Sequence, residues 1–326
     1  MKSGPREFLS RLALLVFSLF AVLAVGETLL RGIGFRYRPL DVQTGSGGDE
    51  RSQLAFENDH FVFDPELIWV PRPGHSVFNT QGFRGPIVAP VKPTGEIRIF
   101  AVGDSNTLGW AGSQGANWPG FLAGGLARLG RQAVVVNAGV WGYSSFQGLR
   151  RLKQSLEYQP DLALISFGSN DAHSVTQRDS EFAQSHGGAA GMLQGLARSR
   201  WGQLCLALRD RVSASATAPT QRVPLAEYRE NLAAMISLAR ARQVRVVLLT
   251  RPYVDESQEP GWWKVRGAAY NVATLEMAEA HGVSVIDLYS HFKSRQELFA
   301  DESHFTDVGH QLAADIIAGE LLALLD

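Results

Sequence analysis

The sequence predicts an α/β fold in which a mainly parallel, five-stranded sheet is covered by helices on both faces. Three observations lead to this prediction: short apolar runs rich in Val, Ile and Leu, helical periodicity in the segments that separate them, and the alternation of the two. Strands of this composition are typical of sheets buried on both faces. Alternating strands and helices favour parallel pairing, because each parallel connection needs a crossover. We expect residues 96–326 to form one such three-layer domain.

The predicted strands are five or six residues long, which suits strands better than helices. They are residues 97–102, 133–137, 162–167, 244–249 and 283–287. In the predicted helices, apolar residues recur every three or four positions, as expected when one helix face packs on a sheet. The helices are residues 119–129, 146–158, 225–239, 265–278 and a last one that begins near 308.

Composition narrows the functional classes. The chain has 326 residues, of which 45% are hydrophobic, and its 31 basic and 32 acidic residues give a net charge of −1. This composition excludes wholesale disorder and argues against a dedicated nucleic-acid-binding protein, which would carry a basic excess. The single cysteine, Cys205, excludes an intrachain disulfide and any CxxC zinc or redox site.

The N-terminal residues 1–30 are predicted to form a membrane anchor. Basic residues occupy positions 2, 6 and 11, and an apolar run follows from Leu12 to Val25 and continues, with interruptions, to Leu30. A spanning helix needs about 20 apolar residues, so the run is just long enough. A cleaved signal peptide and a buried helix of a soluble domain are the alternatives. The first two interpretations both imply that the rest of the chain is exported.

Two further segments stand outside the predicted sheet. Residues 31–95 are interpreted as a linker and N-terminal arm, with a flexible linker by composition at 44–52 and a short strand at 67–70. Residues 172–222 form a long insert without a matching strand, and we expect this insert to rim the site. Loops of this length are often lids or binding loops, and a surface excursion is the alternative.

Three predicted strands end in residues that can carry chemistry. The first ends at Gly103, before Asp104 and Ser105, and a serine on a sharp turn after a strand can act as a nucleophile. The second is followed by Gly139, whose backbone N–H can face a ligand, and the third by Asn170, whose amide can donate to an oxyanion. Singly, these residues also fit a helix cap, a turn glycine and an Asx turn. We expect them to meet at the carboxyl edge of the sheet.

An aspartate and a histidine precede the last predicted helix. Asp301 and His304 are three residues apart, which allows both side chains to lie on one face of a turn. The carboxylate can then hold one ring nitrogen while the other nitrogen faces a serine. A surface turn with a capping aspartate is the alternative. A metal site is disfavoured, because one aspartate and one histidine are too few ligands.

Four short blocks thus follow one another along the chain: Gly103 to Ser105, Gly139, the segment with Asn170, and Asp301 with His304. In this order they resemble the signature blocks of the SGNH/GDSL hydrolase superfamily. Thr107 and Gly109 extend the resemblance at the first block, and Asn137 and Gly142 match the usual surroundings of the second. The resemblance covers residues 96–326. Residues 78–85 also resemble a lead-in segment of membrane-anchored bacterial members, and we interpret that segment as structural.

The resemblance implies a flavodoxin-like α/β/α sandwich with a serine nucleophile and no metal or organic cofactor. It implies that Ser105 is the nucleophile, that His304 is its base and that Asp301 orients His304. The Ser105 N–H, the Gly139 N–H and the Asn170 side chain would form the oxyanion hole. Outside the motifs, the aromatic residues near the same sheet edge are candidates for substrate binding or for packing. They are Tyr253, Trp262 and Trp263.

We therefore expect a serine esterase that hydrolyses carboxylic esters, with a short O-acyl group on a glycan or glycolipid as the expected substrate. An O-acyltransferase of the same fold, acting on an envelope glycan, is the first alternative, because a sugar hydroxyl can capture the same acyl-enzyme. A non-catalytic binding or scaffold protein is the second. The expected partners are this ester and a membrane, and no nucleic acid. The expected location is the bacterial periplasm or cell surface, with residues 1–30 in the membrane.

Overall fold

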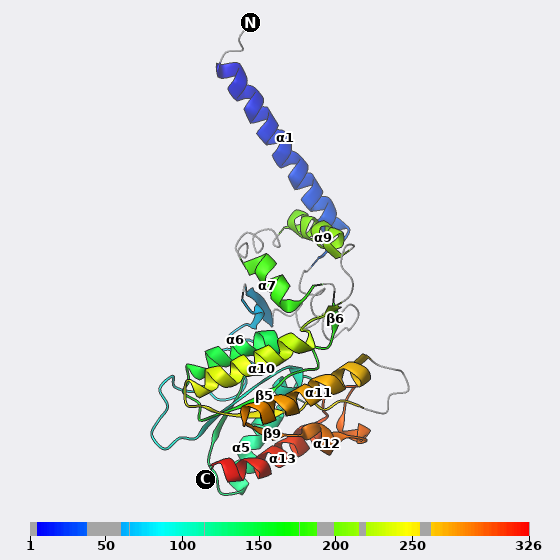
Figure 1. Ribbon diagram of the computed structural model, residues 1–326. Helices are drawn as coiled ribbons and strands as arrows, with labels where there is room; N and C mark the ends of the chain where they lie inside the picture. The colour runs from blue at the N-terminus through cyan, green and yellow to red at the C-terminus, as the bar shows by residue number, and fades with distance from the viewer. Residues whose placement is uncertain are drawn as a thin grey trace.

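The computed structural model describes residues 5–37, 60–64, 66–113, 115–175, 177–187, 199–214, 220–254 and 262–325, and the predicted linker at 44–52 lies outside them. Its centre is a five-stranded sheet in the order β4-β3-β5-β8-β9, in which every neighbouring pair is parallel (Figure 1). This confirms the predicted α/β class. The strands are β3 (Arg98–Gly103), β4 (Val134–Asn137), β5 (Leu162–Ser166), β8 (Arg245–Leu249) and β9 (Ser284–Ile286).

Helices cover both faces of the sheet, because successive strand residues point to opposite sides. In β3, Phe100 and Val102 face the core under α6 (Ser145–Leu156), α10 (Leu225–Arg240) and α11 (Trp262–His281). Ile99 and Ala101 face the second core, under α5 (Trp118–Arg128) and α13 (Asp307–Leu325). Shorter helical segments complete the connections. They are α4 (Ser105–Leu108), α12 (Leu288–Phe292) and a 3₁₀ turn, η1 (Gln296–Leu298).

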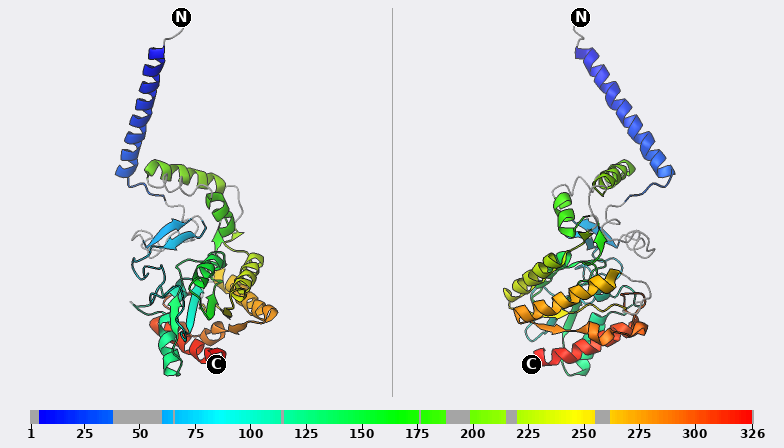
Figure 2. Two further views of the ribbon diagram at one scale, coloured as in Figure 1. Left: turned by 90° about the vertical axis from the view of Figure 1, so that its left-hand side faces the viewer. Right: turned by 45° about the vertical axis from the view of Figure 1, so that its right-hand side comes forward.

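The N-terminal helix α1 (Pro5–Gly32) projects away from the domain (Figures 1 and 2). Among the described residues, two helices are long and apolar enough to cross a membrane by length and composition. The apolar stretch of Leu9–Gly32, within α1, is not buried by the rest of the described structure. The other is α13, whose apolar residues pack against α5 in the second core. A signal sequence near the N-terminus has a similar length and composition, so α1 also fits the cleaved signal peptide considered above.

The described part of the arm packs against the α/β domain. β1 (Phe61–Asp64) and β2 (Ile68–Pro71) form an antiparallel hairpin, and Trp69 on β2 is fully buried. Phe78 and Phe83, from the predicted lead-in, enter the same core as α6. The sequence did not reveal this packing, because the arm supplies single aromatic residues instead of an apolar run.

The insert is also structured where the structure describes it. A short antiparallel pair, β6 (Ser174–Val175) and β7 (Thr220–Gln221), closes its base. Two helices, α7 (Asp179–Gly187) and α9 (Arg200–Ala214), lie between these strands. α9 contacts α1, so the insert joins the N-terminal helix to the α/β domain (Figure 1).

Candidate active site

Ser105 is the first residue of α4, immediately beyond the carboxyl end of β3. The side chain of Asp104 caps α4 by accepting the N–H of Asn106 at 2.9 Å. The turn is tight: a Cβ on Gly103 would lie 2.1 Å from Thr107 Oγ1 and 2.8 Å from Ser166 O. Only glycine fits that position, and this explains why the strand ends in glycine before the serine.

The structure brings Ser105, His304 and Asp301 together in one hydrogen-bonded series. Ser105 Oγ lies 2.8 Å from His304 Nε2, and His304 Nδ1 lies 2.7 Å from Asp301 Oδ2. The second oxygen of Asp301 accepts the backbone N–H groups of Ser303 and His304, at 2.9 and 2.8 Å. An imidazole held in this way on one nitrogen can take a proton from a serine on the other.

Burial alone would raise the pKa of Asp301. The hydrogen bond and the charge interaction with His304 outweigh this effect, together with the backbone N–H groups of Ser303 and His304, and they hold the pKa of Asp301 below its usual value. Asp301 therefore stays ionised at neutral pH. A carboxylate in this position favours the His304 tautomer that has its proton on Nδ1 and leaves Nε2 free to accept from Ser105.

Two side chains that the motif analysis did not single out tie the histidine loop to the serine turn. Asn106 donates through Nδ2 to Ser303 O at 2.9 Å and accepts the Phe305 N–H at 3.0 Å, so it spans both sides of His304. Arg251, at the end of β8, donates to Asp104 Oδ2 at 2.9 Å and to Ser303 O at 2.8 Å. The signal for Arg251 was its place after a predicted strand. Through these bonds Asp104 holds the serine turn in place.

The backbone N–H of Gly139 is occupied, which contradicts its predicted oxyanion role. It donates to Asn137 Oδ1 at 2.9 Å, and a Cβ on Gly139 would lie 2.4 Å from Leu108 N. The glycine therefore allows a close approach to α4, and its N–H closes an Asx turn.

Gly142 lies three residues beyond Gly139, in the same block. It lies in a turn closed by a hydrogen bond from Tyr143 N to Val140 O at 3.3 Å, and its φ of 72° is left-handed, as the third residue of a type II turn requires. Gly142 is buried, and its N–H has no acceptor among the described residues. A buried N–H without a partner is costly unless a ligand or water uses it.

Asn170 lies beside that turn. Its side-chain Nδ2 donates one hydrogen to Tyr143 O at 3.0 Å, which leaves the second hydrogen of the amide for another acceptor. The neighbouring Asp171 is fully buried and accepts the N–H groups of Ser145 and Gly168. Burial raises the pKa of Asp171 to about 7, against the lowering effect of its hydrogen bonds with Ser145. Asp171 thus fixes the backbone around Asn170.

A buried ion pair from the insert holds the same turn. Arg222 and Asp179 have fully buried side chains, with Arg222 Nη2 at 2.7 Å and Nε at 3.0 Å from the two carboxylate oxygens. Arg222 Nη1 also donates to Gly142 O at 2.8 Å. The pair is bidentate, so the direction of the remaining Nη1–H is fixed. The insert therefore sets the position of Gly142.

The arm holds the turn from another side. Trp69 Nε1 donates to Trp141 O at 3.1 Å, and Tyr143 OH donates to Trp69 O at 2.7 Å. The rings of Trp69 and Tyr143 pack edge to face with centroids 5.7 Å apart. The hairpin is thus bonded to the residues on either side of Gly142.

Of the three aromatic candidates for substrate binding, only Tyr253 has a side chain among the described residues. Tyr253 is 6% exposed and stacks on Tyr289 with ring centroids 4.8 Å apart, so it packs inside the domain and offers little surface to a substrate. The backbone of Trp262 and Trp263 opens α11, but their side chains lie outside the described residues. Their predicted role stays a prediction.

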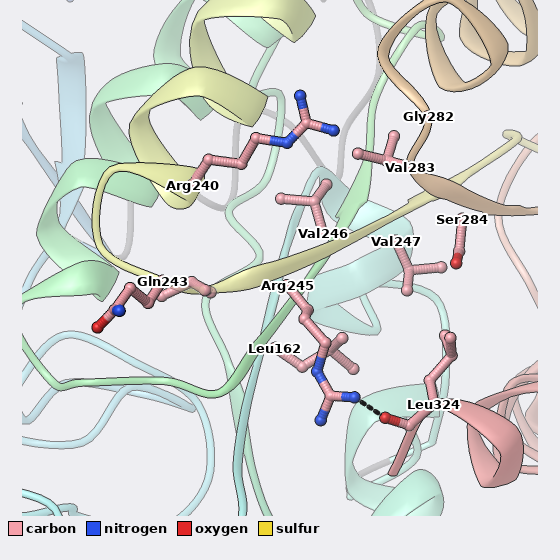
Figure 3. A pocket seen from close by; sticks show the side chains of 11 residues that line it. Leu162, Arg240, Gln243, Arg245, Val246, Val247, Gly282, Val283, Ser284 and Leu324 are labelled. Atoms are coloured by element: carbon pink, nitrogen blue, oxygen red, sulfur yellow. Dashed lines mark hydrogen bonds between the residues drawn. The ribbon is translucent and has the colours of Figure 1, made fainter. Parts of the chain in front are cut away.

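Other features of the described residues do not compete with this site. No group of three or more His, Cys, Asp or Glu side chains that could hold a metal ion occurs among them. A cavity of about 330 Å³ lies at the opposite end of the sheet, between β5, β8, β9 and the end of α13 (Figure 3). Two arginines line it, Arg240 and Arg245, and each donates to a backbone carbonyl. Its described lining contains no carboxylate or imidazole.

Comparisons with known proteins point to one family. Residues 101–312 match the model of a family described as GDSL-like lipase/acylhydrolase. An arylesterase from Vibrio mimicus is 35% identical over 75 residues, which are 23% of this chain and only 38% of that protein. A lipase/acylhydrolase structure from Enterococcus faecalis is 26% identical, with 69% of this chain and 95% of that chain covered and a TM-score of 0.49. An acetyl xylan esterase structure is 17% identical, with coverage of 69% and 100% and a TM-score of 0.49.

Proposed function

The chain belongs to the GDSL-like lipase/acylhydrolase family, and from that premise we propose that it is a serine hydrolase of carboxylic esters. The observation that carries the proposal is the series from Ser105 Oγ through His304 to Asp301, with distances of 2.8 and 2.7 Å. An assembled series of this kind also weighs against a non-catalytic scaffold, since binding alone does not require it.

In the proposed mechanism, Ser105 Oγ attacks the carbonyl carbon of the ester while His304 Nε2 takes the hydroxyl proton. Asp301 keeps the imidazole oriented and stabilises its charged form. When the tetrahedral intermediate collapses, His304 gives the proton to the leaving alcohol and an acyl-enzyme remains on Ser105. Water, activated by His304 in the same way, then releases the acid and restores the serine.

We propose that the negative oxygen of the intermediate is bound by the Ser105 N–H, the Gly142 N–H and Asn170 Nδ2. Ser105 N and Gly142 N have no hydrogen-bond acceptor among the described residues, and Asn170 has one amide hydrogen to spare. Gly142 thus takes the place expected for Gly139, whose N–H is committed to Asn137. A structure of the Ser105 phosphonate adduct tests this choice. We expect its phosphonyl oxygen within hydrogen-bond distance of Gly142 N, and a bond to Gly139 N instead would overturn it.

The finer part of the proposal concerns the substrate and the location. We propose that the acyl group is short, that it is carried by a glycan or glycolipid hydroxyl, and that α1 anchors an exported domain in the membrane. The apolar, unburied surface of Leu9–Gly32 supports the anchor. The arylesterase name of the Vibrio mimicus relative makes aryl esters of short acids the first substrates to test.

The test uses the full chain in detergent with nitrophenyl acetate and nitrophenyl octanoate, each with and without a sugar acceptor. We expect hydrolysis that is lost in Ser105→Ala and faster turnover of the acetyl ester. Acyl groups found on the sugar would instead indicate the acyltransferase alternative. Absence of Ser105-dependent turnover, together with failure of a phosphonate probe to label Ser105, would contradict the proposed activity.

A further inference from the structure

Helix α9 carries an apolar face that the α/β domain leaves uncovered. Gly202 and Leu206 are buried on one side of the helix, whereas Cys205 is exposed and Leu208 is 55% exposed. Trp201, Cys205 and Leu208 are separated by four and three residues, so they share one face. Large apolar side chains gathered on an open face usually mark a contact surface.

The Trp201 end of this face packs against the N-terminal helix α1. Trp201 Nε1 donates to Leu23 O at 2.9 Å, and a Cβ on Gly26 would lie 2.2 Å from the Trp201 ring, so the indole lies directly on α1. Glu27 Oε2 accepts the N–H groups of Arg200 and Trp201 at 2.7 and 3.2 Å. The carboxylate in the last turns of α1 therefore caps α9, since the first N–H groups of a helix lack internal partners.

The contact places α9 at a definite level along the apolar helix. From Leu9, where the apolar span begins, to Gly26 the helix is about 27 Å long at 1.5 Å per residue, which is close to the ~30 Å thickness of the hydrocarbon core, and the charged Glu27 follows. The levels of Leu23 and Gly26, where Trp201 contacts α1, therefore lie within about 5 Å of the end of that core, a zone in which tryptophan is enriched. Cys205 and Leu208 continue its face outward from α1.

We propose that α9 lies in the interface of the bilayer that α1 spans, with its Trp201–Cys205–Leu208 face against lipid. The proposal rests on the anchoring role of α1 proposed above. In the left view of Figure 2, α9 extends sideways from the lower end of α1, which is the position expected for a helix in the membrane plane. Its sequence contains three arginines and one aspartate, a balance that favours anionic headgroups.

A lipid surface fits this face better than a second protein, because the face is continuous with a helix that lipid would surround. Contact of α9 with lipid would also affect the active site. The insert that carries α9 also carries Asp179 and Arg222, which hold the Gly142 turn. Contact with lipid would therefore fix the orientation of the oxyanion side of the active site towards the membrane surface.

The chain's single cysteine makes the test direct, because Cys205 lies on the face in question. The full chain, reconstituted in vesicles of phosphatidylcholine and phosphatidylglycerol, would be labelled at Cys205 with an environment-sensitive fluorophore. Lipids carrying a nitroxide near the headgroup should reduce its emission at least ~2-fold, since interfacial helices bury their apolar face ~5–10 Å deep. The matched control carries the label in a C205S, E320C variant, on an exposed position of α13 far from α1 (Figure 1). This control label should not be quenched.

A second variant tests the face itself. We expect Leu208→Asp to lower the quenching of the Cys205 label, because a carboxylate at the boundary resists burial. Hydrolysis of a soluble ester should be unchanged. Leu129→Asp, at an exposed leucine of the α/β domain, should leave the quenching as it was.

The outcomes separate the two proposals. Release of the chain from vesicles by alkaline carbonate would overturn the anchor, and the interfacial helix with it. Retention of the chain with an unquenched Cys205 label would overturn the interfacial helix alone. A blue-shifted label that the nitroxide lipids do not quench would indicate a protein partner or a second copy on this face, and would likewise overturn the proposal.

Discussion

The two halves of the candidate site are held by different parts of the chain. The triad half is braced within the sheet domain, where Asn106 and Arg251 bind the loop that carries His304. The oxyanion half is braced from outside the sheet, by Trp69 of the arm and by Arg222 of the insert. The loop that carries His304 is thus held by the α/β domain itself, whereas the Gly142 turn is held by the arm and the insert as well. Each prediction below acts on one half and leaves the other intact.

The largest effect is expected in the triad half. Ser105→Ala and His304→Ala should each lower kcat by at least about 10⁴-fold, because serine and histidine act as one unit in this type of catalysis. Their combination should cost little more than either alone. Steady-state hydrolysis of nitrophenyl acetate, with circular dichroism to confirm folding, provides the measurement. Normal turnover in His304→Ala would remove His304 from the mechanism.

In the oxyanion half, Asn170→Ala should lower kcat by about 10²–10³-fold with a much smaller effect on KM, because the amide would act on the charged intermediate more than on the bound ester. Asn231→Ala is the matched control, since Asn231 is a buried asparagine that donates to Ser145 Oγ at 3.0 Å. It should lower stability without this loss of kcat. Equal losses of kcat in both variants would argue that Asn170 is structural.

The insert's contribution should be smaller. Arg222→Lys retains a positive charge near Asp179 but loses the planar group whose Nη1 reaches Gly142 O, and we expect kcat to fall about 10-fold with KM unchanged. Arg98→Lys is the control, because Arg98 is equally buried but donates to Ala89 O and Tyr158 O at the start of β3. An unchanged kcat in Arg222→Lys would show that the Gly142 turn does not need the insert.

The same pair offers a stability measurement. Arg222→Met should lower the free energy of unfolding by about 3–5 kcal/mol, because it leaves the Asp179 charge buried alone. Replacing both residues, as Asp179→Leu with Arg222→Met, should recover part of that loss. A double variant less stable than the single one would contradict this account of the ion pair.

This contrast also explains what the sequence could predict. The five strands were predictable because both faces of the sheet are covered, which leaves apolar runs such as 162–167. Ser105, Asn170, Asp301 and His304 were candidates because four short blocks occur along the chain in the order found in a known superfamily. The proposed exchange of Gly139 for Gly142 could not be predicted, because it depends on which N–H the Asn137 side chain accepts. The bonds from Trp69 and Arg222 join distant segments, and a pattern within one segment does not record them.

The two halves should also respond oppositely to pH. Burial raises the pKa of Asp171, beside Asn170, to about 7, so its contribution to stability falls as pH rises from about 4 to 7. Burial lowers the pKa of His310, on the triad side, to about 3, so its contribution falls as pH drops from about 6.5 towards 3. Asp171→Asn and His310→Leu should each change the slope of unfolding free energy against pH by up to about 1.4 kcal/mol per unit, with opposite signs. Denaturant unfolding of each variant and of the parent protein between these pH values measures the two changes in slope. Changes of the same sign would contradict the opposite pKa shifts of Asp171 and His310.

The smallest effect is expected from the arm. Trp69→Phe keeps the ring packing on Tyr143 but removes the Nε1–H that Trp141 O accepts, which should cost about 1 kcal/mol of stability and leave the turn less fixed. We expect kcat to fall about 3-fold, which corresponds to less than 1 kcal/mol of transition-state stabilisation. Trp118→Phe makes the identical change in α5, in the core on the other face of the sheet, and should lower stability without changing kcat. If the two variants lose kcat equally, the arm is merely a structural addition. If only Trp69→Phe loses it, the hairpin positions the oxyanion turn during catalysis.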